Sequence, residues 1–530
     1  MLTSIDLFAG CGGLTRGLEW AGFECLAFNE LNGDAADSFA MNFPNAIRLD
    51  GDIKTAVSKK VIKETLMPLI ESKGGLDFLC GGPPCQGYSG IGHRRTHKLE
   101  KKDIPTNHLF HEMIRVIKAL KPKVFLFENV EGILSGKWST DGTRGEIFRD
   151  VWKGFSSIRG YTAQPTLLHA YAYGVPQNRP RVMIMGVRND ILMDTNLKPT
   201  RFNPDEGFSS FASRLRNNGG FFPSWNEEEI KAPDLIDVLS DLDFEGWSSD
   251  KPFYQKKAKT DFQKLMRDGN HKDEKGRELL TDHLFSNHSK QVTERFQYML
   301  KNNITKKTDL PQQMRTKKFN QKPLPPRWEK NPTMTVTSLP DDYVHYANPR
   351  TFSVREWARM QTFPDKHHFS GPRTTGGHRR AGNPSLGNWT RDVPKYTQIG
   401  NAVPPLLGKG IGERVKHIIS EIPQKDGNGP RNEQDKFFES LSEENRIKYN
   451  KLTSEEKNEL SSLVNNPEFV QLIKQSVTEY SEEALQNQKN ESIIWKSIKK
   501  STDVVVSNTI FKFAVNIVST VVGGGIIFMG

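Results

Sequence analysis

Short apolar runs separated by helical patterns constrain the fold of this chain more than any other feature. They are Ser4–Phe8, Glu24–Asn29, Leu76–Cys80, Val124–Phe127 and Arg181–Val187, and most of them end at Gly, Pro, Asn or an acidic residue. This alternation is typical of a parallel sheet covered by helices. We therefore expect an α/β domain whose ligands bind at the carboxyl ends of the strands, where the connecting loops diverge.

Length, charge and cysteine content narrow the class of protein. The chain has 530 residues, which is too long for one ordinary domain. A formal net charge of +11 favours a polyanionic partner, because clustered Lys and Arg displace counterions from phosphates, although charge alone proves nothing. The four cysteines lack the spacing of a zinc site or a disulfide framework. No secretory leader precedes the first strand. We expect a cytoplasmic protein without a metal.

The segment Asp6–Gly13 joins the first apolar run to a glycine-rich turn, and a helix is expected to begin near Leu14. Glycines let the backbone approach a ligand closely. Glu30 follows at the end of the next run, where a carboxylate can accept hydrogen bonds from ribose hydroxyls. Asp52 and Ile53 supply a second acidic turn suited to an adenine edge. No lysine of the phosphate-binding type follows the glycines, so the pattern predicts a nucleoside cofactor without phosphates.

The segment Gly81–Ser89 places Cys85 on a turn that two prolines make rigid. A cysteine in this position can be activated if positive charge or a helix N-terminus favours its thiolate. The alternative is an inert, buried thiol. That interpretation suits Cys25 and Cys80 better, because both lie inside apolar runs.

A carboxylate and two guanidinium groups accompany this cysteine. Glu128 follows the apolar run Lys123–Phe127 and so reaches the same sheet edge as Cys85. A lone acid after a strand is ordinarily a surface group. Arg179 and Arg181 occupy alternate positions before another strand, so we expect both guanidiniums on one side. There they could hold a flipped nucleotide, one at the base and one at the phosphate or at Glu128.

Six segments, in this order, resemble the motif set of the DNA cytosine-5 methyltransferases. They are Phe8–Gly13, Pro83–Gln86, Glu128–Val130, Gln177–Arg181, Arg355–Gln361 and Gln398–Pro404. The resemblance covers about Met1–Val187 and Pro332–Ile419. It implies a Rossmann-like fold that uses S-adenosylmethionine, yields S-adenosylhomocysteine and acts on double-stranded DNA.

The resemblance also implies how the chain is divided. Residues 1–188 would begin the catalytic domain, 189–331 would form an irregular target-recognition domain, and 332–422 would return to pack beside the N-terminal strand. Basic stretches with aromatics such as Phe221 and Phe222 could follow a nucleic-acid backbone and stack on bases. The alternative is that they are ordinary core aromatics.

Residues 423–530 would form a helical extension. Thr453 and Glu456 make a capping box that predicts a helix there. The apolar end, 504–530, is marginal for a bilayer-spanning helix. It predicts either a membrane or oligomer contact, or a buried tail helix.

Positions within the motifs imply a role for each site residue. Cys85 would attack carbon 6 of cytosine, and Glu128 would hold the base at ring nitrogen 3. Arg179 and Arg181 would steady the substrate, while Arg355 and Arg359 would brace the two lobes. Gln86 and Asn129 complete the catalytic set. The implied cofactor residues are Phe8, Gly10, Cys11, Gly12, Gly13, Leu14, Glu30, Leu31, Asp52, Ile53, Pro83, Asn401 and Val403. The implied DNA contacts are Ser89, His93, Arg94 and Arg95.

The implied function is methyl transfer to carbon 5 of a flipped cytosine in a specific duplex sequence. A restriction-modification or other defence system is the expected setting, with a cognate restriction endonuclease as a further partner and a nucleoid-associated location. One alternative is an RNA methyltransferase of the same fold that modifies transfer RNA, against which the large variable lobe argues. A second is an inactive DNA-binding relative, against which the intact Cys85, Glu128, Arg179 and Arg181 argue.

Overall fold

The computed structural model describes residues 1–84, 102, 104–193, 195, 197–200, 202–203, 220–223, 232–244, 246–248, 250–315, 321–374 and 392–420, together with 452, 453, 456 and 460. The chain divides into two compact units, Met1–Pro423 and Gln424–Gly530. In the second unit the predicted capping box is confirmed. The amide of Thr453 donates to the Glu456 carboxylate (2.8 Å), and the amide of Glu456 donates to the Thr453 hydroxyl (3.3 Å).

One seven-stranded sheet forms the body of the first unit, in the order β3-β2-β1-β4-β5-β7-β6. The strands are β1 (Leu2–Leu7), β2 (Phe23–Glu30), β3 (Ile47–Asp50), β4 (Phe78–Gly81), β5 (Val124–Val130), β6 (Tyr161–His169) and β7 (Pro180–Arg188). All five predicted strands are confirmed, and β3 and β6 are additional.

The sheet is mixed where we expected a parallel one. Strand β7 runs antiparallel to both β5 and β6. Because of this reversal β7 begins where β5 ends, with Arg181 opposite Val130. Residues at the start of β7 therefore reach the same edge as the carboxyl ends of the parallel strands.

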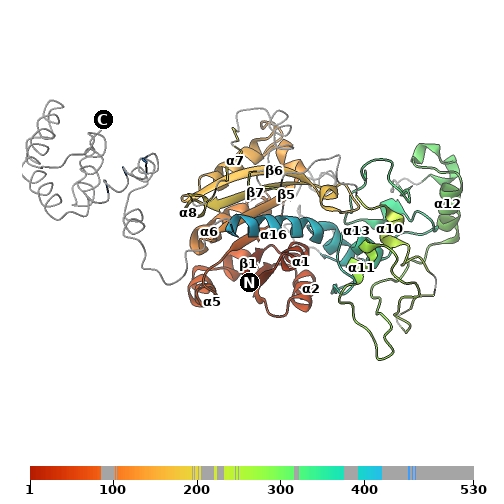
Figure 1. Ribbon diagram of the computed structural model, residues 1–530. Coiled ribbons are helices and arrows are strands. Elements are labelled where there is room, and N and C mark those ends of the chain that lie inside the picture. Colours follow the sequence, from red (N-terminus) through yellow and green to blue (C-terminus); the bar gives the residue numbers. More distant parts are fainter. Residues whose placement is uncertain are drawn as a thin grey trace, which may run out of the picture. The chain divides into compact units, whose positions relative to one another are not determined.

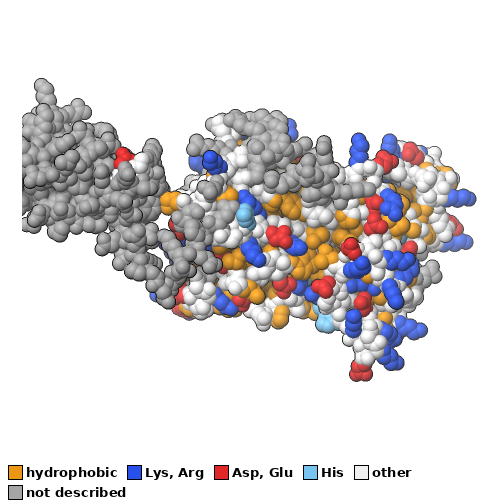
Figure 2. All heavy atoms as spheres, in the orientation of Figure 1, with side chains coloured by type: hydrophobic (Ala, Val, Ile, Leu, Met, Phe, Trp, Pro, Cys, Tyr) orange, Lys and Arg blue, Asp and Glu red, His pale blue; other side chains and the backbone are white. Residues whose placement is uncertain are grey.

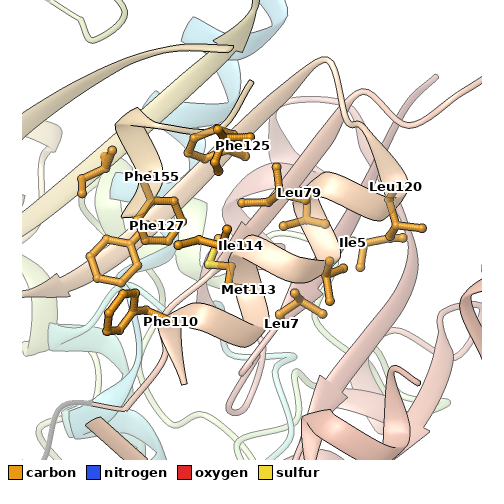
Figure 3. Close-up of a cluster of buried hydrophobic side chains, with 14 of the residues drawn as sticks. Ile5, Leu7, Leu79, Phe110, Met113, Ile114, Leu120, Phe125, Phe127 and Phe155 are labelled. Carbon is orange, nitrogen blue, oxygen red and sulfur yellow. The ribbon is translucent and has the colours of Figure 1, made fainter. Parts of the chain in front are cut away.

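Helices cover both faces of the sheet (Figure 1). They are α1 (Gly13–Trp20), α2 (Gly33–Asn42), α3 (Ile53–Ala56), α4 (Lys59–Val61), α5 (Met67–Ser72), α6 (Phe110–Leu120), α7 (Glu146–Ser156), α8 (Asn189–Met193) and α16 (Pro405–Ser420). On one face, apolar side chains of α6 and α7 pack against β1, β4 and β5. Phe110, Met113 and Phe155 meet Leu7 and Phe127 there (Figure 3). On the other face, α1 and α16 cover Phe78, Leu126 and Met183.

The final helix of the unit packs directly on the first. A Cβ atom on Gly17 of α1 would lie 2.2 Å from the Pro405 carbonyl oxygen, so the two backbones are in contact. Val403 and Leu407 join the same apolar cluster as Leu14 and Leu18. The resemblance implied that this segment would pack beside the N-terminal strand, and the structure places it against α1, the helix that follows that strand.

The remaining elements lie between β7 and α16. They are α10 (Leu235–Leu239), α11 (Asp261–Arg267), α12 (Lys290–Lys301), β8 (Lys322–Pro323), β9 (Tyr343–Val344), α13 (Val354–Met360) and α15 (Lys395–Asn401). One cluster unites Val238 and Trp328 with Trp357 and Met360 of α13. We call the segments described within 232–315 and 321–331 the lobe.

Phe221 and Phe222 are 0 % and 2 % exposed and belong to the cluster that includes α16. For these two residues the interpretation as core aromatics is confirmed. Among the residues that the structure describes, no helix is both long and apolar enough to cross a membrane. The apolar end, 504–530, lies outside the described residues.

Candidate active site

Several of the predicted site residues that the structure describes lie at one end of the sheet. Strands β1 to β5 are mutually parallel, so Phe8, which follows β1, lies at the same end of the sheet as Glu30 and Gly81, the last residues of β2 and β4. Glu128 lies at the end of β5, and Arg181 lies at the start of the reversed β7. The arrangement gives two adjoining regions, one at β1 to β3 and one at β4, β5 and β7.

The glycine-rich turn after β1 requires left-handed backbone. Phe8, Gly10 and Gly12 have φ angles of 57°, 56° and 86°. A Cβ atom on Gly10 would meet nothing within 4 Å, whereas one on Gly12 would lie 2.5 Å from the Phe43 ring. The space above Gly10 is therefore open to a ligand, and Gly12 lets the turn pack closely on α2.

Glu30 is tied to this turn. Its Oε2 accepts the amide of Gly10 (2.9 Å) and its Oε1 accepts the amide of Asn32 (2.8 Å). Burial raises the pKa of Glu30, and these backbone hydrogen bonds act in the opposite direction. Each carboxylate oxygen has a second lone pair that can accept a further hydrogen bond.

Leu31 and Asp52 both follow Glu30 in the sequence. Leu31 is 68 % exposed, which is unusual for a large apolar side chain. Asp52 is exposed and caps α3 by accepting the amide of Lys54 (2.8 Å), while Ile53 is buried. Two acidic groups, an exposed leucine and the open space above Gly10 fit the ribose, the adenine and the amino-acid part of S-adenosylmethionine.

The second region holds an ion pair. Arg181 Nε lies 2.7 Å from Glu128 Oε1, and the two side chains are 9 % and 12 % exposed. A Cβ atom on Gly82 would lie 2.7 Å from Glu128 Oε2, so the other carboxyl oxygen contacts the start of the proline turn. The Asn129 amide group donates to the Pro83 carbonyl (3.2 Å). Strand β5 thus carries Glu128 and, through Asn129, is hydrogen-bonded to the turn that leads to Cys85.

Several predicted residues lie outside the described residues. These are Cys85, Gln86, Ser89, His93, Arg94 and Arg95. The described turn ends at Pro84, which is exposed, whereas Pro83 is buried.

Arg179 has partners that the sequence did not predict. It is 2 % exposed and donates to the carbonyl oxygens of Val336 (2.8 Å) and Gly400 (2.7 Å). Burial lowers its pKa, and the neighbouring charge of Arg181 acts the same way. We expected the guanidiniums of Arg179 and Arg181 to lie on one side. Arg179 instead precedes β7 and donates to main-chain carbonyls within residues 332–420, whereas Arg181 pairs with Glu128.

Gln177 makes similar contacts. Its side-chain oxygen accepts the amide of Val336 (2.8 Å), and its side-chain nitrogen donates to the Met360 carbonyl (3.1 Å). The segment Gln177–Arg181 therefore fastens residues 334–336, 360 and 400 to the edge of the sheet.

Other predicted cofactor residues are placed differently. The side chains of Cys11 and Leu14 are buried in apolar clusters, so these residues can contact a ligand at the turn only through their backbone atoms. Asn401 is exposed, and the Val403 carbonyl lies against Gly13. Burial raises the pKa of the Cys80 and Cys25 thiols, which disfavours their thiolate forms.

Asp6 was not predicted as a site residue. It is 2 % exposed, and the Thr15 hydroxyl donates to its Oδ2 (2.6 Å). Burial raises its pKa to about 7, and the charges of Glu30 and Glu128 add to that effect. The signal in the sequence is an acid inside an otherwise uncharged strand.

Arg355 and Arg359, for which the motifs implied a bracing role, both contact the lobe. Arg359 is fully buried and pairs with Asp241 of the lobe (2.7 Å) and with Asp365 (2.6 Å). Arg355 donates to the Thr281 hydroxyl (2.7 Å). Within the described parts of the chain, no group of three or more His, Cys, Asp or Glu side chains is arranged to hold a metal ion.

Comparison with known proteins agrees with this geometry. The model of the C-5 cytosine-specific DNA methylase family matches residues 2–417. The type II methyltransferase M.DdeI of Desulfomicrobium norvegicum is 30 % identical over 431 residues, which cover 79 % of this chain and 89 % of that protein. M.AgeI of Thalassovita gelatinovora, also a type II methyltransferase, is 28 % identical over 469 residues, covering 79 % of this chain and all of that protein (100 %).

A solved structure supports the fold. An Escherichia coli prophage protein assigned as a DNA modification methyltransferase superposes with a TM-score of 0.55 at 23 % identity, over 79 % of this chain and 100 % of that one. The chain therefore belongs to the C-5 cytosine-specific DNA methylases, a family that takes its methyl group from S-adenosylmethionine.

Proposed function

We propose that this enzyme modifies one cytosine in a specific double-stranded DNA sequence as the methyltransferase of a type II restriction-modification system. M.DdeI and M.AgeI, to which it is similar over most of its length, are type II methyltransferases. A cognate restriction endonuclease is then a further partner. The observation that carries the proposal is the Glu128–Arg181 ion pair beside the turn that leads to Cys85.

In the proposed reaction, the Cys85 thiolate adds to carbon 6 of a flipped cytosine, and the electron pair displaced from the ring makes carbon 5 nucleophilic. After the methyl group is transferred to carbon 5, the proton on carbon 5 passes to water, its C–H electron pair restores the 5,6 double bond, and the Cys85 thiolate leaves carbon 6. Glu128 lies at ring nitrogen 3, and a proton held between its carboxyl group and that nitrogen stabilises the charge that develops on the ring. Arg181 holds one oxygen of this carboxyl group, so it fixes the direction of the other.

Two further residues act by positioning. Arg179 holds the carbonyls of Val336 and Gly400, and Asn129 holds the carbonyl of Pro83. Both connect main-chain segments that border the reacting base. We assign them no direct contact with substrate.

When bound, S-adenosylmethionine supplies an electrophilic methyl group on a sulfonium centre. Glu30 and Asp52 would accept hydrogen bonds from its ribose and adenine, and the exposed Leu31 would pack on the adenine ring. The backbone from Gly10 to Gly13 would allow close approach of the amino-acid part. Pro83, Asn401 and Val403 would complete the surroundings.

The lobe offers the basic surface that duplex DNA requires. Figure 2 shows Lys and Arg side chains over α11 and α12. Lys264, Lys272 and Lys290 are 61 %, 60 % and 91 % exposed. Exposed lysines of this kind bind phosphates without reading sequence, so binding should weaken steeply with salt. We propose Ser89 and His93 to Arg95 as contacts near the flipped base.

The experiment that tests the catalytic assignment uses duplex DNA with 5-fluorocytosine at the target position, located first by bisulfite sequencing of DNA from cells that express the chain. Fluorine at carbon 5 blocks proton loss, so the wild type should form a covalent adduct visible on a denaturing gel. Cys85→Ser should form none. Glu128→Gln should lower the methylation rate by about a hundredfold or more.

The matched control is Glu131→Gln, which changes an exposed acid three residues further along the chain. It should methylate at the wild-type rate. Adduct formation by Cys85→Ser would refute the assignment of Cys85 as the nucleophile. Methylation of transfer RNA in place of duplex DNA would refute the proposal that duplex DNA is the substrate.

A further inference from the structure

His367 lies beneath the glycine-rich turn, in the segment that follows α13. Its side chain is fully buried, at 0 % exposed. Its Nε2 lies 3.0 Å from the carbonyl oxygen of Cys11, and because a carbonyl can only accept, Nε2 must carry the proton. Cys11 stands between the left-handed Gly10 and Gly12. The hydrogen bond therefore holds the middle of the turn.

The surroundings of His367 keep its ring neutral. The ring packs between Phe363 and Phe369, with centroid separations of 4.6 and 5.1 Å. Burial lowers the pKa of His367 well below its ordinary value, and the nearby charges of Arg16 and Arg355 act in the same direction. A neutral imidazole has one N–H, and Nδ1 has no hydrogen-bond partner among the described residues. The bond to Cys11 therefore selects the tautomer.

The backbone of His367 is itself held in place. Its amide donates to the Pro364 carbonyl (2.9 Å), and its carbonyl accepts from Arg355 (3.0 Å). The preceding Asp365 is paired with the buried Arg359. The Cys11 side chain packs in the same apolar cluster as Phe363 and Phe369. The turn is thus fastened to residues 363–369 through both the side chain and the carbonyl of Cys11.

We propose that His367 is a positioning residue for the methyl donor, although none of the six motifs includes it. By holding the Cys11 carbonyl it keeps the turn in the shape in which the Gly10 amide reaches Glu30 and the space above Gly10 stays open. Loss of the donor would leave a buried carbonyl without a partner, and the turn would relax to satisfy it. This inference rests on the cofactor site proposed above.

Three variants separate the hydrogen bond from packing. His367→Phe keeps a ring of similar size without a donor. His367→Gln places an amide N–H near the position of Nε2, whereas His367→Asn has the same chemistry but too short a reach. Binding of S-adenosylhomocysteine to the DNA-free chain is measured by titration calorimetry. The Kd should rise about tenfold for the Phe and Asn variants, a fold-change in the range that one buried hydrogen bond gives.

The Gln variant should bind S-adenosylhomocysteine with about the wild-type Kd, since it restores the donor. The KM for S-adenosylmethionine should rise with the Kd, while the KM for DNA stays unchanged. His368→Gln, which alters the half-buried neighbour, is the control and should change neither constant.

Wild-type affinity in the Phe and Asn variants would overturn the proposal. An equal loss in the Gln and Phe variants would also overturn it, because packing would then be the cause. If the Phe variant does not fold by circular dichroism, the comparison of Gln with Asn decides. Failure of the wild type to bind S-adenosylhomocysteine would refute the cofactor site itself, which is a distinguishable result.

Discussion

At the scale of single residues, Asp6 joins the two regions of the site. It is the one ionisable side chain in β1, and it lies beneath the turn that carries Gly10. Burial raises its pKa to about 7, with contributions from Glu30 on one side and Glu128 on the other. The pKa of Asp6 in the folded state lies above its ordinary value of 3.8. At pH values between these two pKa values, Asp6 is protonated in the native state and ionised in the unfolded state.

We predict from this that Asp6→Asn gains stability relative to the wild type as pH rises. Well below pH 4 both states of the wild type are protonated, and between about pH 4 and 7 the unfolded state is mostly ionised while the native state keeps its proton, so wild-type stability falls there. The asparagine stays neutral and keeps an oxygen for the Thr15 hydroxyl. The difference in unfolding free energy should reach a few kcal/mol near pH 7. Urea denaturation from pH 4 to 8 measures it.

The control for this prediction is Asp50→Asn at the end of β3, where the side chain is 71 % exposed. That variant should show no pH-dependent difference of comparable size. A constant difference between Asp6→Asn and the wild type at every pH would contradict the raised pKa.

At the scale of elements, strand positions were predictable because apolar runs ending in polar residues mark buried parallel strands. That pattern also placed Glu128 and Arg181 at one edge. Strand β3 escaped prediction because it is short and half exposed. The direction of β7 and the partners of Arg179 could not be predicted. The direction of a strand depends on which neighbour it pairs with. Arg179 binds the main-chain carbonyls of Val336 and Gly400, and because every residue has such a carbonyl, the residue types do not indicate the contact.

The contact of α1 with α16 gives a prediction at this scale. Gly17→Ala should lower the unfolding free energy by about 3 kcal/mol, since the added methyl would lie 2.2 Å from the Pro405 carbonyl and the helices must separate. Gly33→Ala is the matched control, because Gly33 opens α2 with nothing within 4 Å of a Cβ atom. It should be neutral or slightly stabilising. Thermal melting of both variants checks this, and equal melting temperatures would count against the close packing.

At the scale of the whole first unit, buried charge connects the lobe to the sheet domain. Arg359 of α13 pairs with Asp241 after α10 and with Asp365 in the segment that carries His367. Arg267 of α11 shares Asp241 (2.6 Å). A chain of direct contacts therefore runs from the lobe, which we propose binds DNA, to the turn at the proposed cofactor site.

Arg359→Met tests how much this junction contributes. The substitution removes one cation and leaves Asp365 buried without its charge partner, so we expect the unfolding free energy to fall by about 3–5 kcal/mol. Lys264→Met removes a cation from an exposed pair in the same lobe, 61 % and 98 % exposed, and should cost far less than Arg359→Met. Denaturant unfolding measures both losses, and added salt should diminish only the second, because exposed pairs are screened more than buried ones. Equal, salt-sensitive losses in the two variants would mean that water reaches Arg359, and the junction would then not hold the lobe against the sheet domain.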